Sequence, residues 1–384
     1  MAIDNCFASK RWTEPEEWMS VVQALGLKYV EASADNECDP LYTNKSYLAD
    51  WGQKVREASK KTGVTVSQFF SGHGTYATLG LCHNDPRIRE HILQNWMLPM
   101  SQLAGSFNTN FGFFAHGFSL STLESPLLYN NMLLSLYGSL SQIAVWANQY
   151  GCKTVGVEQM YSPHQPPWTL NGTQQLLQAV YAQHQKPMYL TMDVGHQVGQ
   201  AKFIRPQMQE IDRCLGLPQE DALAQMPWLG SREAEEYYRQ AAASPDKKEE
   251  MLQKIQKSVE EHSYCFSDKG DEDTYLWMEK FGAYSPIVHL QQTTGESSQH
   301  LPFTDETNAS GKIKGDKILK ALQKSYQSPQ DSSMPQKAED VYLTLEIFSK
   351  TNDKPGDIID RLRKSVQYWR QFVPQDGMEL SDLL

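Results

Sequence analysis

The feature that most constrains the fold is a regular alternation of short apolar runs with amphipathic stretches of helix length. This alternation is typical of repeated βα units that build a parallel sheet. Eight runs of strand length follow the pattern, at residues 3–8, 28–33, 65–74, 111–117, 154–160, 188–196, 286–293 and 341–348. Eight strands separated by helices predict the α/β class and a closed (β/α)8 barrel.

An open, doubly wound sheet is the alternative arrangement of such units. That fold usually carries a glycine-rich phosphate loop after its first strand. The sequence contains neither GxGxxG nor GxxxxGK[ST], which favours the barrel. The 384 residues exceed an average domain, but α/β barrels reach this length with insertions. We therefore expect residues 1–384 to form a single (β/α)8 barrel domain.

One interval breaks the regular spacing, between the sixth and the seventh apolar run. It is rich in charge, has a helical period, and contains turn signals at "ASPD" and "SDKGDED". We expect a helical insertion over residues 200–285. Because it follows a barrel strand, it would lie beside the mouth of the barrel, where a lid would belong.

Charge and cysteine content exclude several classes of protein. The formal charge is −11, from 46 acidic and 35 basic residues, which is unfavourable for nucleic-acid binding. The six cysteines include no Cys-x-x-Cys pair, which indicates reduced thiols and a cytoplasmic location. We find no signal peptide and no apolar window long enough to span a membrane, so no membrane partner is expected. The apolar stretch "MLLSLYGSLSQIAVW" could cover the barrel or pair with a second copy, which leaves a homo-oligomer open.

Ionisable residues recur near the ends of the predicted strands. In a parallel barrel these ends meet at one mouth, where active sites lie. Burying an unpaired ionisable group costs several kcal/mol, so stability alone does not explain the repetition. The residues are Glu31, His73, His116, Glu158, Asp193, His289 and Glu346.

The last four strands supply the most specific set, which is Glu158, Asp193, His289 and Glu346. Three carboxylates and one imidazole suit Mn²⁺, Mg²⁺ or Co²⁺ better than a structural zinc ion, which prefers thiolates. Adjacent carboxylates also repel one another unless a cation lies between them. The pattern predicts a divalent-metal site.

The segments "GVEQMYSP", "TMDVGH", "IVHLQQT" and "LTLEIF" resemble the strand-end motifs of the xylose isomerase-like TIM barrels. Within that superfamily the chain is most similar to sugar and sugar-phosphate isomerases and ketose 3-epimerases, over nearly its whole length except the insertion. The resemblance implies that Glu158, Asp193, His289 and Glu346 bind one divalent ion, often Mn²⁺. It also implies that His196 hydrogen-bonds a sugar substrate.

The chain departs from the epimerases after the seventh strand. Epimerases usually have an Arg a few residues past the strand-seven His, as a substrate contact, whereas "HLQQTTGESSQHLPF" contains none. Gln291 and Gln292 are the candidate replacements. His73 and His116 are further candidates for substrate binding. Two roles stay open for Glu31, which are a structural ion pair inside the barrel and a substrate contact.

These residues predict a divalent-metal-dependent isomerase or epimerase of a ketose or ketose phosphate. Glu158 and Glu346 would act as acid and base on either side of a metal-stabilised enediolate. Aldose–ketose isomerisation by a metal-assisted hydride shift is an alternative with the same site. A nuclease acting on abasic DNA would need more ligands and a basic groove, and a metal-free sugar-binding or regulatory barrel would not need the four intact ligands.

Overall fold

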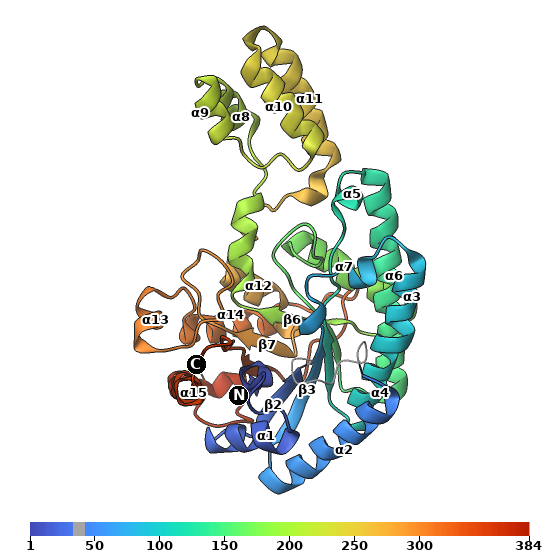
Figure 1. Ribbon diagram of the computed structural model, residues 1–384, viewed down its shortest axis with the longest axis vertical. Coiled ribbons are helices and arrows are strands. Elements are labelled where there is room, and N and C mark those ends of the chain that lie inside the picture. Colours follow the sequence, from blue (N-terminus) through green and yellow to red (C-terminus); the bar gives the residue numbers. More distant parts are fainter. Residues whose placement is uncertain (34–42, 384) are drawn as a thin grey trace.

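The computed structural model describes residues 1–33 and 43–383. Eight parallel strands pair in chain order, and β8 pairs with β1 to close the barrel (Figure 1). The strands are β1 (Ala2–Asp4), β2 (Tyr29–Ser33), β3 (Thr65–Ser71), β4 (Asn110–Phe113), β5 (Val155–Glu158), β6 (Tyr189–Asp193), β7 (Ile287–Leu290) and β8 (Tyr342–Leu345). All eight predicted strands and the barrel are confirmed.

Helices lie between consecutive strands and cover the outside of the barrel (Figure 1). Those of the barrel layer and its loops are α1 (Pro15–Ala24), α2 (Lys45–Thr62), α3 (Pro86–Ile92), α4 (Leu98–Ser106), α5 (Leu120–Leu123), α6 (Pro126–Tyr150), α7 (Leu170–His184), α12 (Thr274–Phe281), α13 (Asp305–Ser310), α14 (Gly315–Gln327) and α15 (Pro355–Arg370). No described helix is long and apolar enough to cross a membrane.

Local sequence explains how these helices begin and end. The Asn44 side chain accepts a hydrogen bond from the Tyr47 amide at the start of α2, and Gly63 ends that helix with φ 74°. The inner face of α2 buries Leu48, Trp51 and Val55 against the barrel. Burial of such apolar side chains is the main stabilising term of the fold.

Four further helices between β6 and β7 stand apart from the barrel (Figure 1). They are α8 (Met208–Leu215), α9 (Gln219–Ala224), α10 (Arg232–Ala243) and α11 (Lys248–Glu261), and we call residues 208–261 the helical arm. The predicted range 200–285 also includes α12, which packs against α14 in the barrel layer. Whether the arm acts as a lid stays a prediction.

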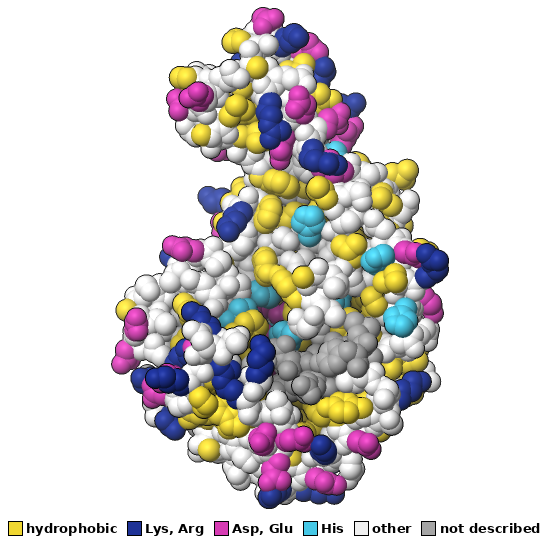
Figure 2. All heavy atoms as spheres, in the orientation of Figure 1, with side chains coloured by type: hydrophobic (Ala, Val, Ile, Leu, Met, Phe, Trp, Pro, Cys, Tyr) yellow, Lys and Arg dark blue, Asp and Glu magenta, His cyan; other side chains and the backbone are white. Residues whose placement is uncertain are grey.

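Two chain segments, one leaving the barrel and one returning to it, connect the arm to the barrel. Ile204 and Ser267 form a parallel β-bridge where the chain leaves and returns. Beside it, the Arg232 guanidinium lies 3.2 Å from the Glu124 carboxylate, and the Tyr264 hydroxyl donates to the Leu123 carbonyl over 2.8 Å. Arg232 of the arm and Tyr264, just outside it, thus contact the end of α5 and the residue after it. Figure 2 shows histidine side chains on the face of the barrel below the arm.

Candidate active site

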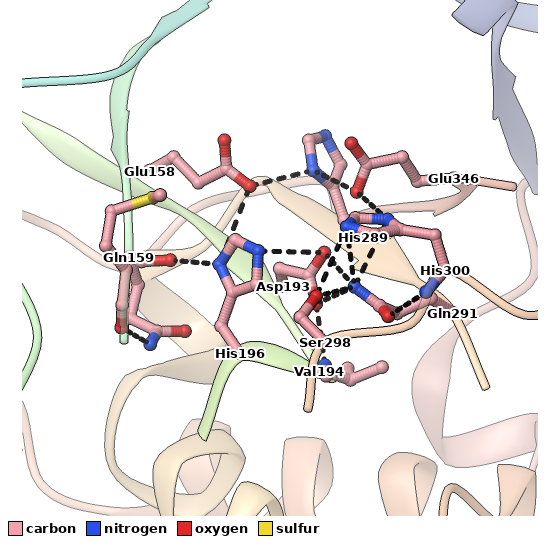
Figure 3. A network of polar contacts seen from close by, with 12 residues as sticks. Glu158, Gln159, Asp193, Val194, His196, His289, Gln291, Ser298, His300 and Glu346 are labelled. Carbon is pink, nitrogen blue, oxygen red and sulfur yellow. Dashed lines mark hydrogen bonds and ion pairs between the residues drawn. The ribbon is translucent and has the colours of Figure 1, made fainter. Parts of the chain in front are cut away.

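The structure brings together Glu158, Asp193, His289 and Glu346, the four predicted metal ligands (Figure 3). One ligand atom from each lies within 4.8 Å of the others, and every one of these residues is at most 1% exposed. Asp193 and His289 are direct neighbours in the β6–β7 register. The parallel register therefore delivers the four groups to one point, because each lies within one residue of the end of its strand.

The spacing of these atoms fits a shared cation. His289 Nδ1 lies 3.3 Å from Glu158 Oε1 and 3.2 Å from Glu346 Oε2. Two ligands about 2.1 Å from one ion, at a tetrahedral angle, stand about 3.4 Å apart. The Oε2 atoms of Glu158 and Glu346 are buried without a hydrogen-bond partner among the described residues. Buried unsatisfied carboxylate oxygens are costly, and a cation would satisfy them.

Glu31 holds the other side of the His289 ring. The two fully buried groups meet through His289 Nε2 and Glu31 Oε1, 2.9 Å apart, and Glu31 Oε2 accepts a hydrogen bond from Gln68 Nε2 over 3.0 Å. Histidines that ligate metals usually donate their second N–H to such a carboxylate, which fixes the ring. The structure thus gives Glu31 an ion pair within the barrel and turns His289 Nδ1 toward the centre of the site.

The charges inside the barrel perturb one another strongly. Burial, partly opposed by His289, raises the pKa of Glu31 to about 8, and burial likewise raises the pKa of Asp193 to about 6. Burial disfavours a charged His289, but Glu31 and Glu346 raise its pKa well above the usual range. Burial disfavours a charged Glu346 as well, yet His289 and His300 hold its pKa well below normal.

His196, the predicted substrate contact, lies beside the four residues. Its Nδ1 donates to the Gln159 carbonyl over 2.7 Å, which leaves Nε2 facing Asp193 Oδ2 at 3.7 Å (Figure 3). The Tyr161 ring packs edge-on against the imidazole at 4.9 Å. A ring fixed in this way presents Nε2 to the centre of the site, where it could meet a substrate hydroxyl.

Gln291 also lies at the site, where its amide is engaged by protein groups. Its Nε2 donates to both oxygens of Asp193 over 2.9 and 2.8 Å, and its Oε1 accepts from the amides of Gln299 and His300. These bonds orient Asp193 and fix the loop that follows β7. Gln292 points elsewhere and donates to the Ile313 carbonyl over 3.0 Å.

The two remaining predicted histidines, His73 and His116, lie in different surroundings. His73 lies at the edge of the site, with Nε2 4.0 Å from Glu346 Oε1. His116 belongs to none of the metal-binding groupings among the described residues. Its Nε2 lies 3.1 Å from Thr75 Oγ1, its ring packs on Trp96 at 5.2 Å, and burial lowers its pKa to about 4. A substrate-binding role for either histidine stays a prediction.

Sequence reasoning missed two residues of the site. Asp4 is fully buried at the end of β1, but the first predicted strand extended to residue 8 and hid this strand end. The chain instead enters a 3₁₀ helix (Asn5–Ala8), which Asp4 caps. His300 lies 3.4 Å from Glu346 Oε2 and stacks on Phe348, with ring centroids 4.0 Å apart. It belongs to a loop, where no strand or helix period could have indicated it.

A small apolar cluster separate from the main core lies next to these polar groups. It consists of Phe70, Phe114 and Met160, with Tyr161 packed against it. Phe70 contacts the His289 ring edge-on at 5.6 Å. Apolar rings beside a few convergent polar groups are typical of small-molecule sites.

Comparison with known proteins finds similar barrels and one partial sequence match. No protein-family profile matches the chain. A curated relative, D-erythrulose 1-phosphate 3-epimerase of Brucella abortus, is 27% identical over 111 residues, which is 29% of this chain and 32% of the relative. The match therefore spans about a third of that relative's length.

Three solved structures extend the comparison to almost the whole chain. A protein from Rhodospirillum rubrum, provisionally named a xylose isomerase, superposes with a TM-score of 0.69 at 16% identity, covering 97% of this chain and 98% of that one. An L-ribulose 3-epimerase gives 0.54 at 11% identity over 97% and 93%. D-psicose 3-epimerase from Clostridium cellulolyticum, solved with D-tagatose, gives 0.53 at 12% identity over 100% and 93%. The chain thus has the closed (β/α)8 barrel fold of the xylose isomerase-like proteins and ketose 3-epimerases.

Proposed function

We propose that the protein is a divalent-metal-dependent epimerase or isomerase of a ketose or ketose phosphate. The observation that carries the proposal is the convergence of four buried groups on one point, with carboxylate oxygens that lack hydrogen-bond partners among the described residues. The curated relative is named for a ketose phosphate, and two structural neighbours are named for ketoses, which supports this substrate class.

Glu158, Asp193, His289 and Glu346 would hold the metal. Mn²⁺ is the expected ion, with Mg²⁺ and Co²⁺ as alternatives, because the ligands are three oxygens and one nitrogen. When bound, the ion supplies positive charge to the substrate oxygens next to the reacting carbon. Glu31 and Gln291 support this set from outside, since they hold His289 and Asp193 in place.

Glu158 and Glu346 are the proposed acid and base. They come from β5 and β8, on different sides of the barrel, and His289 Nδ1 lies between them. One carboxylate removes the proton from the carbon beside the carbonyl, which leaves an enediolate. The other returns a proton from the opposite face and inverts the centre, or delivers it to the neighbouring carbon and moves the carbonyl.

The surrounding side chains suit a sugar. His196 Nε2 faces the centre of the site and can hydrogen-bond a hydroxyl group. The apolar cluster of Phe70, Phe114 and Met160 offers a surface for the C–H side of the same molecule. A hydride shift between two carbons, as in aldose–ketose isomerisation, would use the same residues to bind but no carboxylate as base.

Turnover in D₂O tests the proposal and separates the two chemistries. The purified protein, loaded with Mn²⁺, is incubated with a panel of tetruloses, pentuloses and hexuloses and their 1-phosphates, and products are followed by NMR. Deuterium at the inverted carbon supports proton transfer through Glu158 and Glu346. Product without deuterium refutes the acid–base mechanism and favours a hydride shift.

Matched variants make the result specific. Glu158→Gln should abolish exchange, whereas Asp271→Asn, which changes an equally buried carboxylate outside the site, should not. The absence of both turnover and exchange across the panel, in protein shown to contain Mn²⁺, would contradict the proposed function.

A further inference from the structure

We propose that Asp4, His73 and Glu346 bind a second divalent cation, beside the first and sharing Glu346 with it. This second site rests on the proposed function only through the shared carboxylate. One ligand atom from each of the three residues lies within 4.8 Å of the others. Asp4 belongs to β1 and His73 to the turn after β3, so this second set shares only Glu346 with the first.

The distances among these atoms suit metal ligands better than a direct hydrogen bond. Asp4 Oδ2 lies 3.6 Å from His73 Nε2, and His73 Nε2 lies 4.0 Å from Glu346 Oε1. A direct N–H···O bond is about 2.7–3.2 Å long. Two ligands of one ion, each about 2.1 Å from it, stand roughly 3.0–3.4 Å apart at octahedral or tetrahedral angles. A small inward movement of His73 and Glu346 would complete the set.

The two oxygens of Glu346 face different partners. Oε2 faces His289 Nδ1 at 3.2 Å and His300 Nδ1 at 3.4 Å, on the side of the first site. Oε1 is the oxygen nearest His73. A carboxylate with one oxygen toward each of two ligand sets can bridge two cations, as in two-metal sites with ions about 3.5–4 Å apart.

An unsatisfied side-chain oxygen of Asp4 is independent evidence for a ligand between Asp4 and His73. Its side chain is fully buried, and Oδ1 accepts a hydrogen bond from the Cys6 amide over 2.6 Å. Its Oδ2 is buried without a hydrogen-bond partner among the described residues. Leaving a buried carboxylate oxygen unsatisfied is costly, and the free oxygen points toward His73.

The charge balance of the barrel interior supports a second cation. Five carboxylates are buried within it to at least 99%: Asp4, Glu31, Glu158, Asp193 and Glu346. One divalent ion offsets two negative charges among these carboxylates. A second ion beside Asp4 would lower the remaining electrostatic cost, because like charges at such short range repel strongly in a low-dielectric interior.

The backbone and three aromatic rings fix His73 in position. Gly72 has φ 132°, and a Cβ there would lie 2.6 Å from Phe114, so the turn that delivers His73 requires glycine. The rings of Phe70, Phe114 and Phe348 lie 5.0, 5.6 and 5.9 Å from the imidazole. The side chain keeps 8% of its surface exposed.

Metal counting tests the second site directly. Metal-free protein is equilibrated by dialysis against Mn²⁺, and bound metal per chain is measured by mass spectrometry together with the electron paramagnetic resonance spectrum. We expect about two Mn²⁺ per chain and a spin-coupled spectrum, as for ions roughly 4 Å apart. Asp4→Asn keeps the cap on Cys6 but removes the charge, and should bind about half as much metal and give an uncoupled spectrum. Asp271→Asn, a buried carboxylate outside the site, should match the wild type.

Each result decides a different question. One Mn²⁺ per chain in the wild type, unchanged in Asp4→Asn, overturns the second site and leaves the proposed function intact. No bound Mn²⁺ in the wild type overturns both. His73→Gln provides a second variant if Asp4→Asn does not fold, and a full wild-type content of Mn²⁺ in folded His73→Gln would also overturn the second site.

Discussion

Replacing Glu31 with glutamine isolates the carboxylate that holds the His289 ring. The side chain keeps its shape, and its oxygen can still accept from His289 Nε2, which lies 2.9 Å away in the wild type. The amide removes the negative charge that Glu31 carries above its raised pKa of about 8. In the wild type, Gln68 Nε2 donates to Glu31 over 3.0 Å. In the variant an NH₂ group lies opposite that donor, so the Gln68 amide must flip. The substitution therefore tests the charge and the orientation of one hydrogen bond.

The expected loss follows from that bond. A hydrogen bond to a charged group contributes about 1.5–3 kcal/mol, and a neutral one about half as much. Losing the difference costs about 0.75–1.5 kcal/mol, which weakens the binding constant by roughly 4- to 13-fold. Partners of metal-ligating histidines typically contribute about 10–100-fold in metal affinity when loss of ring orientation is included. We expect Glu31→Gln to weaken Mn²⁺ binding by about 10–100-fold.

Calorimetric titration of the metal-free protein with Mn²⁺ measures this change. Asp271→Asn is the matched control, because Asp271 is also a buried carboxylate and it bonds the Leu170 amide, outside the site. Near-ultraviolet circular dichroism confirms that both variants keep the packed fold. A dissociation constant for Glu31→Gln within twofold of the wild type would refute the reasoning that Glu31 positions a metal ligand.

Three further predictions follow from the geometry. Glu346→Gln should lower kcat by about 100-fold or more, because it removes a group proposed to transfer a proton, and steady-state turnover of the active ketose measures this. Chelation should lower the melting temperature, and Mn²⁺ at about 100 times its dissociation constant should restore about 2.7 kcal/mol, measured by thermal unfolding. Gly80→Ala should destabilise the fold by about 1–3 kcal/mol in urea unfolding, because Gly80 has φ +47° and the new Cβ would lie 2.1 Å from the His116 ring.

Each of these predictions has a specific contrary result. Full turnover by Glu346→Gln would remove this residue from the chemistry. An unchanged melting temperature after verified metal removal would show that the site does not couple to folding. Gly138→Ala is the control for Gly80→Ala, because Gly138 lies within α6 and a Cβ there meets nothing within 4 Å. Equal stability of the two alanine variants would contradict the strain argument.

The order and number of strands were predictable because each strand of a parallel barrel is buried and therefore apolar. The same reasoning found Glu158, Asp193, His289 and Glu346, since an ionisable residue at the end of an apolar strand is conspicuous. It failed at Asp4, where the apolar run "IDNCFA" continues into a buried 3₁₀ helix and looks longer than the three-residue strand. The predicted insertion over residues 200–285 spans both the arm helices and α12, because their amphipathic periods are alike.

The sequence by itself determined the strand set and the chemical type of the site, because hydrophobic period and side-chain identity are local properties. The partners of each group were decided by tertiary structure. Glu31 and His289 are 258 residues apart in the chain, yet closure of the barrel places them 2.9 Å from each other. His300 and Gln291 reach Glu346 and Asp193 only through the fold of one irregular loop. Which carboxylates share a cation depends on such contacts, because electrostatic interactions fall steeply with distance and burial decides their strength.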